Sequence, residues 1–495
     1  MRSRRPWALP AAALRVTMAP LTMAILLIAC VTLCAAGCSS APSPSPSPSH
    51  SSAQDDLFAI AGLPYTTGPN GMRPTAPAPT ETVTGTDGGP VDHLVATAID
   101  DIEKFWAQTY PVVFGHPFST EHNLLSWDSS SPAAPQFCGT GGYNYHNAAY
   151  CQEDDSIGWD RSLLIPLYQK GFGDIGVLAV MAHEYGHRIS NLAAINDSTI
   201  VVNEQRSDCF SGAYLHWVAA GNSPAFTVNT TSGLTAAAAT LAASRDNRRT
   251  ANEHGTAFDR VSAFSLGVHG GAAACRDLTL DAIRARQAKE PAPYDVSGRL
   301  VPTAFSAAEI PQLIDSLAAA FHRPGANATR FTDTERDCTG APARQPVTYC
   351  TDTGSVLYDP TRLTAIGRVG YSGPPQIPTL MTSGFSAYSL LASRYTLSVL
   401  TADGLPTDRP RSAAAAACMT GYWAAATRDS GEFTLGPGDL DAIVSGLLDN
   451  GLVASDAQSR ALPIGLGRFD AFASGYLGGG CEQVGSPQGG MTQSR

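Results

Sequence analysis

The chain contains few lysines and has no surplus of positive charge. Lysine occurs only at positions 104, 170 and 289, and 43 acidic residues outnumber 32 basic ones, which gives a formal net charge of −11. Proteins that bind nucleic acid do so largely through basic side chains that neutralise phosphates. A chain of this composition offers no such basic face in bulk, so we expect no nucleic-acid partner.

Among the cysteines, no two have the C-x-x-C spacing of common zinc-binding motifs. This absence argues against a zinc ion held by cysteines. Three of the eleven cysteines lie at positions 30, 34 and 38. The other eight are Cys138, Cys151, Cys209, Cys275, Cys338, Cys350, Cys418 and Cys481. An even number of cysteines in an exported chain predicts disulfide bonds.

The N-terminal segment has the pattern of an export signal. Three arginines within the first five residues precede an apolar run at about residues 21–33. The run ends in Ala35-Ala36-Gly37-Cys38, which resembles the lipobox of bacterial lipoproteins. We expect residues 1–37 to be a lipoprotein signal peptide and Cys38 to be lipidated, which would anchor the protein to the cell membrane outside the cytoplasm. An uncleaved signal anchor is the alternative.

Two further segments predict no core of their own. Proline and serine alternate from Pro42 to Pro48, a composition that favours extended chain. We therefore expect residues 38–88 to form a tether followed by an irregular segment, and residues 483–495 to be a disordered tail.

A metal-binding pattern lies in an apolar stretch that reads as a helix. Residues 183–187 have the form H-E-x-x-H. Histidines at i and i+4 of a helix share one face, so His183 and His187 can reach one zinc ion. Glu184, beside the first histidine, is then placed to take a proton from a water molecule at the metal.

A second pattern begins sixteen residues after His187. It reads Asn203-Glu204-Gln205-Arg206-Ser207-Asp208 and lies in another helical segment. A catalytic zinc ion takes three protein ligands, and Glu204 can supply the third. Asp208, one turn further on, can accept the N–H of a ligating histidine and fix its tautomer. The alternative is an ordinary amphipathic helix pair with solvated charges.

These two patterns together resemble the glutamate-zincin motif, H-E-x-x-H followed by N-E-x-x-x-D. More narrowly, the chain resembles the bacterial neutral zinc metallopeptidase family, including the lipoprotein peptidases of mycobacteria. Further matching residues are Cys138 and Cys151, Asp208-Cys209-Phe210-Ser211-Gly212, His254-Gly255-Thr256, Arg260, Phe264 and Gly267. The resemblance covers roughly residues 90–276. It implies a zincin-like fold, one Zn²⁺ ion as cofactor, and a peptide or protein substrate.

An internal repeat predicts two similar halves. Cys338 and Cys350 follow Cys138 and Cys151 by 200 and 199 positions, and Arg468 follows Arg260 by 208. We expect a catalytic domain at residues 89–290 and a degenerate repeat at 300–482. If the halves fold alike, the simplest pairing joins Cys138 to Cys151, Cys209 to Cys275, Cys338 to Cys350, and Cys418 to Cys481. Pairing of the first cysteine with the third and the second with the fourth within each half remains open.

The second half has lost the metal-binding residues. At an offset of 210, the H-E-x-x-H residues fall on Ser393, Arg394 and Leu397; at 209, Glu204 and Asp208 fall on alanines. We therefore expect no metal there. Residues kept in both halves, such as Arg260 with Arg468 and Asp160 with Asp359, are interpreted as scaffold.

His254 is found only in the first half, because its counterpart at an offset of 208 is Leu462. It could stabilise the oxyanion formed when water attacks a peptide carbonyl. Alternatively, it could make only local hydrogen bonds.

The sequence predicts an α+β fold dominated by helices, with helices near residues 91–109, 174–191 and 198–219. We interpret Asp155 to Asp160 as an edge strand to which an extended substrate adds. The predicted function is that of a lipid-anchored zinc metallopeptidase. The alternatives are an idle envelope scaffold or binding lipoprotein, and a zinc amide hydrolase that acts on cell-wall peptides.

Overall fold

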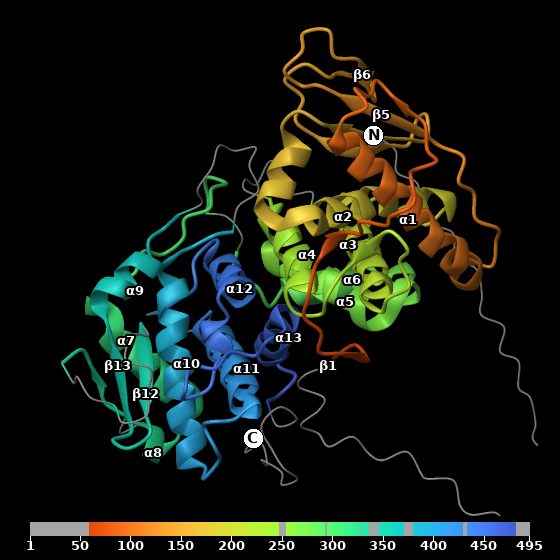
Figure 1. The fold of residues 1–495 in the computed structure, drawn as a ribbon. Helices are drawn as coiled ribbons and strands as arrows, with labels where there is room; N and C mark the ends of the chain where they lie inside the picture. Colours follow the sequence, from red (N-terminus) through yellow and green to blue (C-terminus); the bar gives the residue numbers. More distant parts are fainter. Residues whose placement is uncertain are drawn as a thin grey trace, which may run out of the picture. The chain divides into compact units, whose positions relative to one another are not determined.

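Helices form most of the described chain, and small sheets accompany them (Figure 1). The computed structural model describes residues 59–246, 254–292, 295–327, 329–334, 338, 346–370, 380–428 and 433–481. The predicted α+β class with dominant helices is confirmed. The predicted signal peptide, Cys38 and the C-terminal tail lie outside the described residues. Within the described ranges, no helix is both long enough and apolar enough to cross a membrane.

The first half begins with residues 59–88, the described part of the predicted tether and irregular segment. They are mostly coil, with two-residue strands that pair with each other or with the body. The short strands of the whole first half are β1 (Ala59–Ile60), β2 (Leu63–Pro64), β3 (Gly71–Met72), β6 (Gln136–Phe137), β7 (Thr140–Gly141) and β10 (Phe226–Thr227). Strand β3 pairs with β10, so this N-terminal segment is attached to a site more than 150 residues away in sequence.

Six helices of the first half follow the periodic apolar segments of the sequence. They are α1 (Pro90–Phe114), α2 (Leu164–Leu192), α3 (Ile200–Ala219), α4 (Ser232–Ala243), α5 (Ala257–Arg276) and α6 (Leu280–Gln287). The three predicted helices are thus confirmed, although their ends differ. Helix α2 starts ten residues before the predicted position, because a kink at Gly173 (φ 68°) joins a short helix to the one that carries the motif. A positive φ is easily adopted only by glycine.

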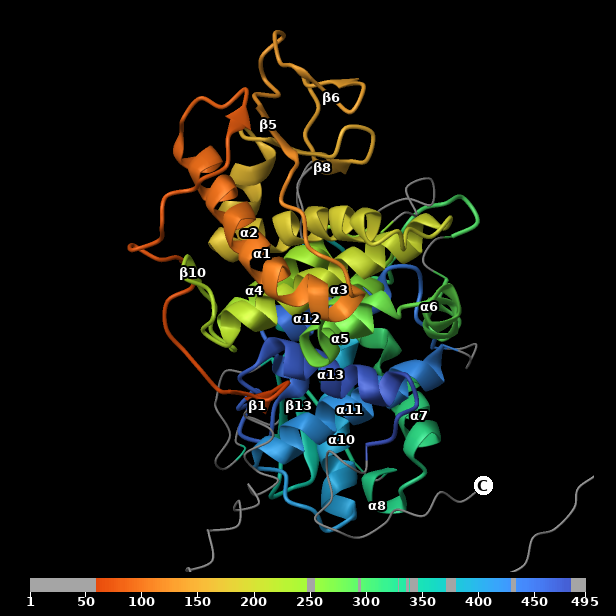
Figure 2. The ribbon, with the colours of Figure 1, turned by 90° about the vertical axis from the view of Figure 1, so that its right-hand side faces the viewer.

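A four-stranded sheet lies next to α1 and α2 (Figures 1 and 2). Its strands are β4 (Val83–Thr84), β5 (Asn123–Trp127), β9 (Ser156–Asp160) and β8 (Ala148–Cys151), in that order. The prediction that Asp155–Asp160 forms an edge strand is wrong. Strand β9 pairs with β5 on one side and β8 on the other, and all five of its residues are buried. The edge beside α2 is β8, whose hairpin with β9 places it outermost.

Among the described residues, the second half contains fewer strands than the first. Its α-helices and strands are α7 (Ile310–Phe321), α8 (Pro324–Asn327), β11 (Phe331–Thr332), β12 (Val347–Cys350), β13 (Ser355–Tyr358), α9 (Pro360–Ile366), α10 (Gly384–Ala402), α11 (Pro410–Thr427), α12 (Asp439–Asp449) and α13 (Gly465–Tyr476). Its sheet has the order β11-β13-β12, with β11 parallel and β12 antiparallel to β13. Strands β5, β9 and β8 have the same order and directions. In each half, the outer strand packs against the following long helix, α2 or α10.

Four disulfide bonds join the eight cysteines in the predicted pairing: Cys138–Cys151, Cys209–Cys275, Cys338–Cys350 and Cys418–Cys481. The two longer-range bridges join α3 to α5, and α11 to the residues after α13. Glycines allow each helix pair to approach closely. A Cβ on Gly267 would lie 1.8 Å from Cys209 O, and a Cβ on Gly475 would lie 1.9 Å from Cys418 O. The equivalent glycines therefore make the same backbone contact in both helix pairs.

The two halves contact each other through matching helices. Helix α12 packs against α4 and α5, and α13 packs against α4. The first residue of α5 donates from Ala257 N to Asp441 Oδ1 of α12 at 2.9 Å. The first residue of α13 donates from Gly465 N to Thr235 Oγ1 of α4 at 3.1 Å. The contact is thus reciprocal.

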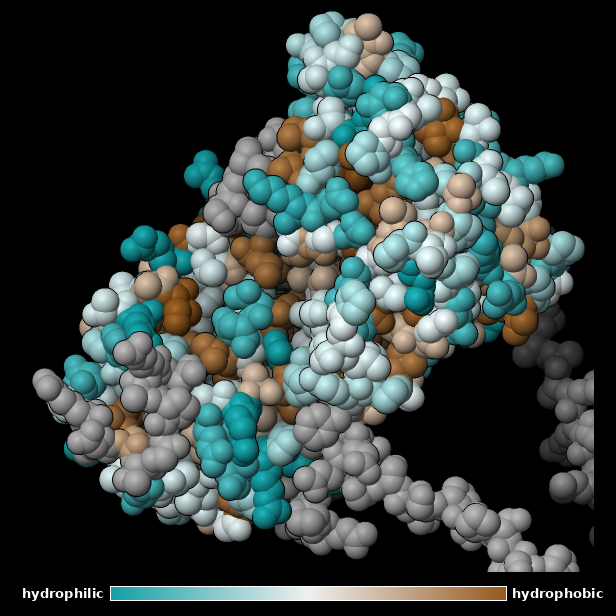
Figure 3. Space-filling model, in the orientation of Figure 1, coloured by the Kyte–Doolittle hydropathy of each residue, from teal (hydrophilic) through white to brown (hydrophobic). Residues whose placement is uncertain are grey.

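The face of the molecule that is turned to the viewer in Figure 1 carries both polar and apolar residues. Figure 3 shows teal and pale side chains over much of it, with brown apolar side chains between them. The largest fully buried side chains of the core are aromatic and include Trp106, Trp159, Tyr185 and Trp423.

Candidate metal centre

The predicted metal-binding residues come from two helices, α2 and α3, that pack unusually closely. The glycine inside the H-E-x-x-H motif permits this approach, because a Cβ on Gly186 would lie only 2.8 Å from Ser207 Cα. Glu204 lies one turn before Ser207 on α3. The close packing therefore brings its carboxylate to the face of α2 that carries His183 and His187.

The donor atoms of these three residues converge. His183 Nε2 lies 3.2 Å from His187 Nε2 and 3.2 Å from Glu204 Oε2. His187 Nε2 lies 3.5 Å from Glu204 Oε1. Glu204 Oε2 is buried and has no hydrogen-bond partner of good geometry among the described residues. Two lone-pair atoms at such distances repel each other unless a proton or a metal ion lies between them. Two overlapping groups of side chains lie close enough together to hold a metal ion: His183 with Glu184 and His187, and His183 with Glu204 and His254.

Asp208 sits behind the first histidine, as predicted. Its Oδ1 lies 2.7 Å from His183 Nδ1. With Asp208 ionised, Nδ1 carries the hydrogen and Nε2 presents its lone pair to the cluster. Burial opposes ionisation, but the Arg260 guanidinium and His183 lower the pKa of Asp208 below its usual value. When a metal ion replaces the proton on Nε2, the hydrogen on Nδ1 therefore leaves the histidine in the tautomer that a metal ligand needs.

Arg260 was interpreted from sequence as scaffold, and the structure corrects this interpretation. Its Nε donates to Asp208 Oδ2 at 2.9 Å, and its Nη2 donates to Asp208 Oδ1 at 2.7 Å. The same Nη2 lies 3.4 Å from His183 Nδ1. Arg468 at the equivalent position contacts only backbone carbonyls of Leu462, Leu447 and Pro463. The shared arginine thus belongs to the charged network of the site in the first half only.

The cluster attracts positive charge. Burial lowers the pKa of His183, but Asp208 and Glu204 outweigh this effect and raise it to about 10. Burial raises the pKa of Glu204, yet His187 and His183 bring it well below its usual value. Without a metal ion, a proton on His183 balances the two carboxylates. A metal ion would displace that proton, so metal affinity should fall as the pH is lowered.

Glu184 lies between α2 and the edge strand β8. Its Oε2 accepts a hydrogen bond from Tyr150 N at 3.1 Å, and burial raises its pKa. A carboxylate with a raised pKa is a better proton acceptor at neutral pH. Sequence reasoning missed Tyr150, since nothing in the local pattern connects it with a residue 34 positions away.

Two hypotheses were given for His254: local hydrogen bonding, or a place at the site where it could stabilise an oxyanion. The structure shows both a local hydrogen bond and an approach to the site. Its Nδ1 lies 3.2 Å from Asp246 Oδ1. Its Nε2 lies 3.5 Å from Glu204 Oε2, and His183, Glu204 and His254 form a second group that could hold a metal ion. Sequence reasoning missed Asp246, which lies eight residues before the histidine. The structure describes Asp246 but not residues 247–253, which separate it from His254.

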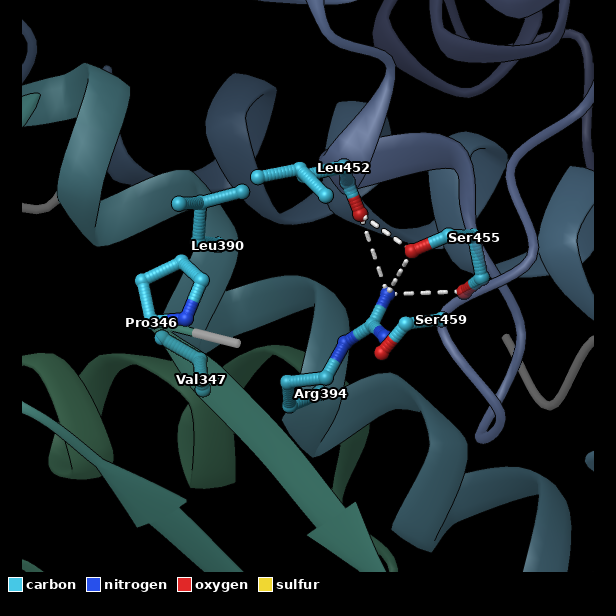
Figure 4. Close-up of a pocket in the computed structure, with 7 residues that line it drawn as sticks. All are labelled: Pro346, Val347, Leu390, Arg394, Leu452, Ser455 and Ser459. Carbon is cyan, nitrogen blue, oxygen red and sulfur yellow. Dashed lines mark hydrogen bonds between the residues drawn. The ribbon is translucent and has the colours of Figure 1, made fainter. Parts of the chain in front are cut away.

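In the second half, an arginine occupies the place of Glu184. Figure 4 shows the Arg394 guanidinium directed at Leu452 O and Ser455 O, at 3.1 and 2.7 Å. Arg394 Nη1 also donates to Asp456 O at 3.0 Å. The neighbouring cavity measures only about 10 Å³. Backbone oxygens thus surround the Arg394 guanidinium.

No known protein family, no curated protein and no solved structure matches this chain.

Asp208→Asn is expected to weaken metal binding about 10–100-fold, the usual effect of losing a carboxylate behind a ligating histidine. The amide has no charge to hold the His183 tautomer and leaves the Arg260 guanidinium without its counter-ion. Competition with a chromogenic chelator would measure the dissociation constant. Asp277→Asn, at an exposed carboxylate paired with Arg276, is the control. An unchanged constant in Asp208→Asn would contradict the role of Asp208.

Proposed function

We propose that the protein is a zinc-dependent metallopeptidase whose ligands are His183, His187 and Glu204. The convergence of these three side chains beside Glu184 carries the proposal. Zinc–ligand bonds of about 2.0–2.2 Å in a tetrahedral site separate ligand atoms by about 3.3–3.5 Å. The separations of 3.2, 3.2 and 3.5 Å fit this geometry. The buried Glu204 Oε2 without a hydrogen-bond donor fits it as well.

A bound zinc ion would polarise the scissile carbonyl and make a water molecule acidic enough to attack at neutral pH. The chain's own groups then move the protons. Glu184 accepts one from the attacking water and delivers it to the leaving amine. The hydrogen bond from the Tyr150 amide keeps the Glu184 carboxylate in place while it accepts and then releases the proton.

His254 is the residue proposed to stabilise the developing oxyanion. Asp246 accepts from its backbone N at 3.0 Å and holds its Nδ1, which leaves Nε2 directed toward the ligand cluster. Between the Asp246 and Glu204 carboxylates, His254 would act in its imidazolium form, in which Nε2 also carries a hydrogen. Such a donor stabilises negative charge that develops only in the transition state.

The substrate would be an extended peptide along β8. Among the strands that the structure describes, β8 is outermost in its sheet and next to α2. An edge strand offers main-chain groups that pair with an extended chain. We also propose that the enzyme acts outside the cytoplasm, tethered through Cys38. The four disulfide bonds fit an oxidising compartment.

Metal removal tests the proposal directly. The purified chain should contain one zinc ion by mass spectrometry and should hydrolyse casein. Removal with 1,10-phenanthroline should abolish hydrolysis, and one equivalent of Zn²⁺ should restore it. Hydrolysis by a metal-free chain would contradict the proposal. Bound zinc with cleavage only of cross-linked cell-wall peptides would favour the amide hydrolase. Bound zinc without any cleavage would favour the scaffold.

A further inference from the structure

His254 lies in the segment that follows the end of α4 at Ser244 and precedes α5 at Ala257. One carboxylate joins the described residues at the two ends of this segment. Asp246 Oδ2 accepts from His254 N at 3.0 Å and from Gly255 N at 2.9 Å, while Asp246 N donates to Gly255 O at 3.1 Å. Asp246 and His254 are therefore linked as one unit, whose position depends on the two ends of the segment.

A residue of the other half contacts both of those ends. Asp441 lies in the first turn of α12 and is 3% exposed. Its Oδ1 accepts from Ala257 N at 2.9 Å, and its Oδ2 lies 3.5 Å from Arg245 Nε. Arg245 immediately precedes Asp246, and Ala257 lies three residues after His254. One buried carboxylate from the second half thus bridges the end of α4 and the beginning of α5.

The residue after His254 is a glycine, whose backbone dihedrals are the least restricted of any residue. Gly255 has φ of +99°, a conformation that glycine adopts freely, and it directly follows His254. Rotation at Gly255 would move the His254 ring relative to Glu204. The bonds of Asp246 oppose this rotation from within the segment, whereas Asp441 fixes the segment to the body.

A second contact between the halves, from Gly465 N to Thr235 Oγ1, provides a comparison for the contact that Asp441 makes. On the other side of the interface, Thr235 Oγ1 accepts from Gly465 N, the equivalent of Ala257 N. Three residues before Gly465 stands Leu462, so no histidine depends on that contact. The same half-to-half contact therefore holds a possible catalytic side chain at one end only.

We propose that Asp441 is a positioning residue for His254, and that the second half contributes to the reaction by holding this side chain over the metal centre. The inference rests on the proposed function. It assigns a task to a half whose own metal-binding residues have been replaced. Asp441 acts through its contacts with Arg245 and Ala257 and does not touch the substrate.

The test compares Asp441→Ala with Thr235→Val in the full chain, each with and without His254→Ala. Asp441→Ala should lower kcat about 10- to 100-fold at nearly unchanged KM, because a displaced oxyanion donor loses transition-state stabilisation. In the His254→Ala background, the same change should have no further effect on kcat. Thr235→Val should leave kcat within about twofold. Equal losses with and without His254 would overturn the proposal.

A second readout does not depend on activity. The histidine ring signals of the metal-free chain are recorded by NMR, and His254 is identified by its absence in His254→Ala. Asp441→Ala should shift the His254 signals, and Thr235→Val should not. An unmoved His254 signal in Asp441→Ala would overturn the inference even if the chain is a peptidase. A shifted signal in a chain that hydrolyses no peptide would leave the positioning contact intact and reject only the proposed function.

Discussion

Replacing Glu184 with Gln is expected to lower kcat for peptide hydrolysis about 10²–10⁴-fold while the chain keeps its zinc ion. General-base catalysis typically contributes this much to an enzymatic rate. An amide cannot accept the proton of the attacking water, yet its oxygen can still accept the Tyr150 N–H that positions Glu184. The packing of α2 against β8 should therefore persist, and the loss should be chemical.

The measurement combines zinc content, thermal stability and initial rates on one peptide substrate. Glu153→Gln, at an exposed carboxylate on the turn between β8 and β9, serves as the control and should keep full activity. Loss of zinc along with activity would mean that Glu184 is itself a metal ligand, as its inclusion in a cluster with His183 and His187 permits. Full activity in Glu184→Gln would show that another group is the base.

Arg260→Met should lower the free energy of unfolding by about 3–5 kcal/mol, the usual cost of removing one partner of a buried ion pair. Both residues are buried, and Arg260 donates two hydrogen bonds to Asp208. The methionine leaves a carboxylate in the interior whose remaining contact is His183. Denaturant unfolding of the metal-free and metal-loaded chains would measure the loss.

The matched control is Arg468→Met in the second half. Its guanidinium binds only backbone carbonyls, so the loss should be about 1–3 kcal/mol. The pH dependence offers a further check. The pKa of Asp208 lies below its unfolded value of 3.8, so the ion pair stabilises the fold above that pH, and this contribution disappears as the pH falls through the folded pKa. The difference between wild type and Arg260→Met should therefore shrink in acid. Equal losses for the two arginines at every pH would contradict this account.

Several features could be predicted because they depend on local spacing. The helix over His183 and His187 follows from apolar periodicity, and the i, i+4 spacing alone places both imidazoles on one face. The repeat of the cysteines predicts this disulfide pairing as the simplest of two, and the structure confirms it. Asp160 and Asp359, present in both halves, were interpreted as scaffold. Each accepts a backbone hydrogen bond at the start of a helix, from Leu164 N and Arg362 N.

Other features could not be predicted, because they depend on how distant segments pack. Strand β9 seemed an edge strand, although its burial on both faces had already weakened the alternation of polar and apolar residues. Arg260 seemed a scaffold residue because Arg468 matches it in sequence. Arg260 binds the Asp208 carboxylate, whereas Arg468 binds backbone carbonyls, and the residue matched with Asp208 by the sequence offset is Ala417.

By itself, the sequence determined which side chains can form the metal cluster, because two histidines one helical turn apart and a nearby glutamate are defined by short-range geometry. It also determined that the second half lacks these groups. The tertiary structure alone decided that α2 and α3 approach closely at Gly186, that Tyr150 holds Glu184, and that Asp441 reaches the segment of His254. These contacts join residues up to 184 positions apart. They arise only when buried surfaces have packed, which no local pattern of residues specifies.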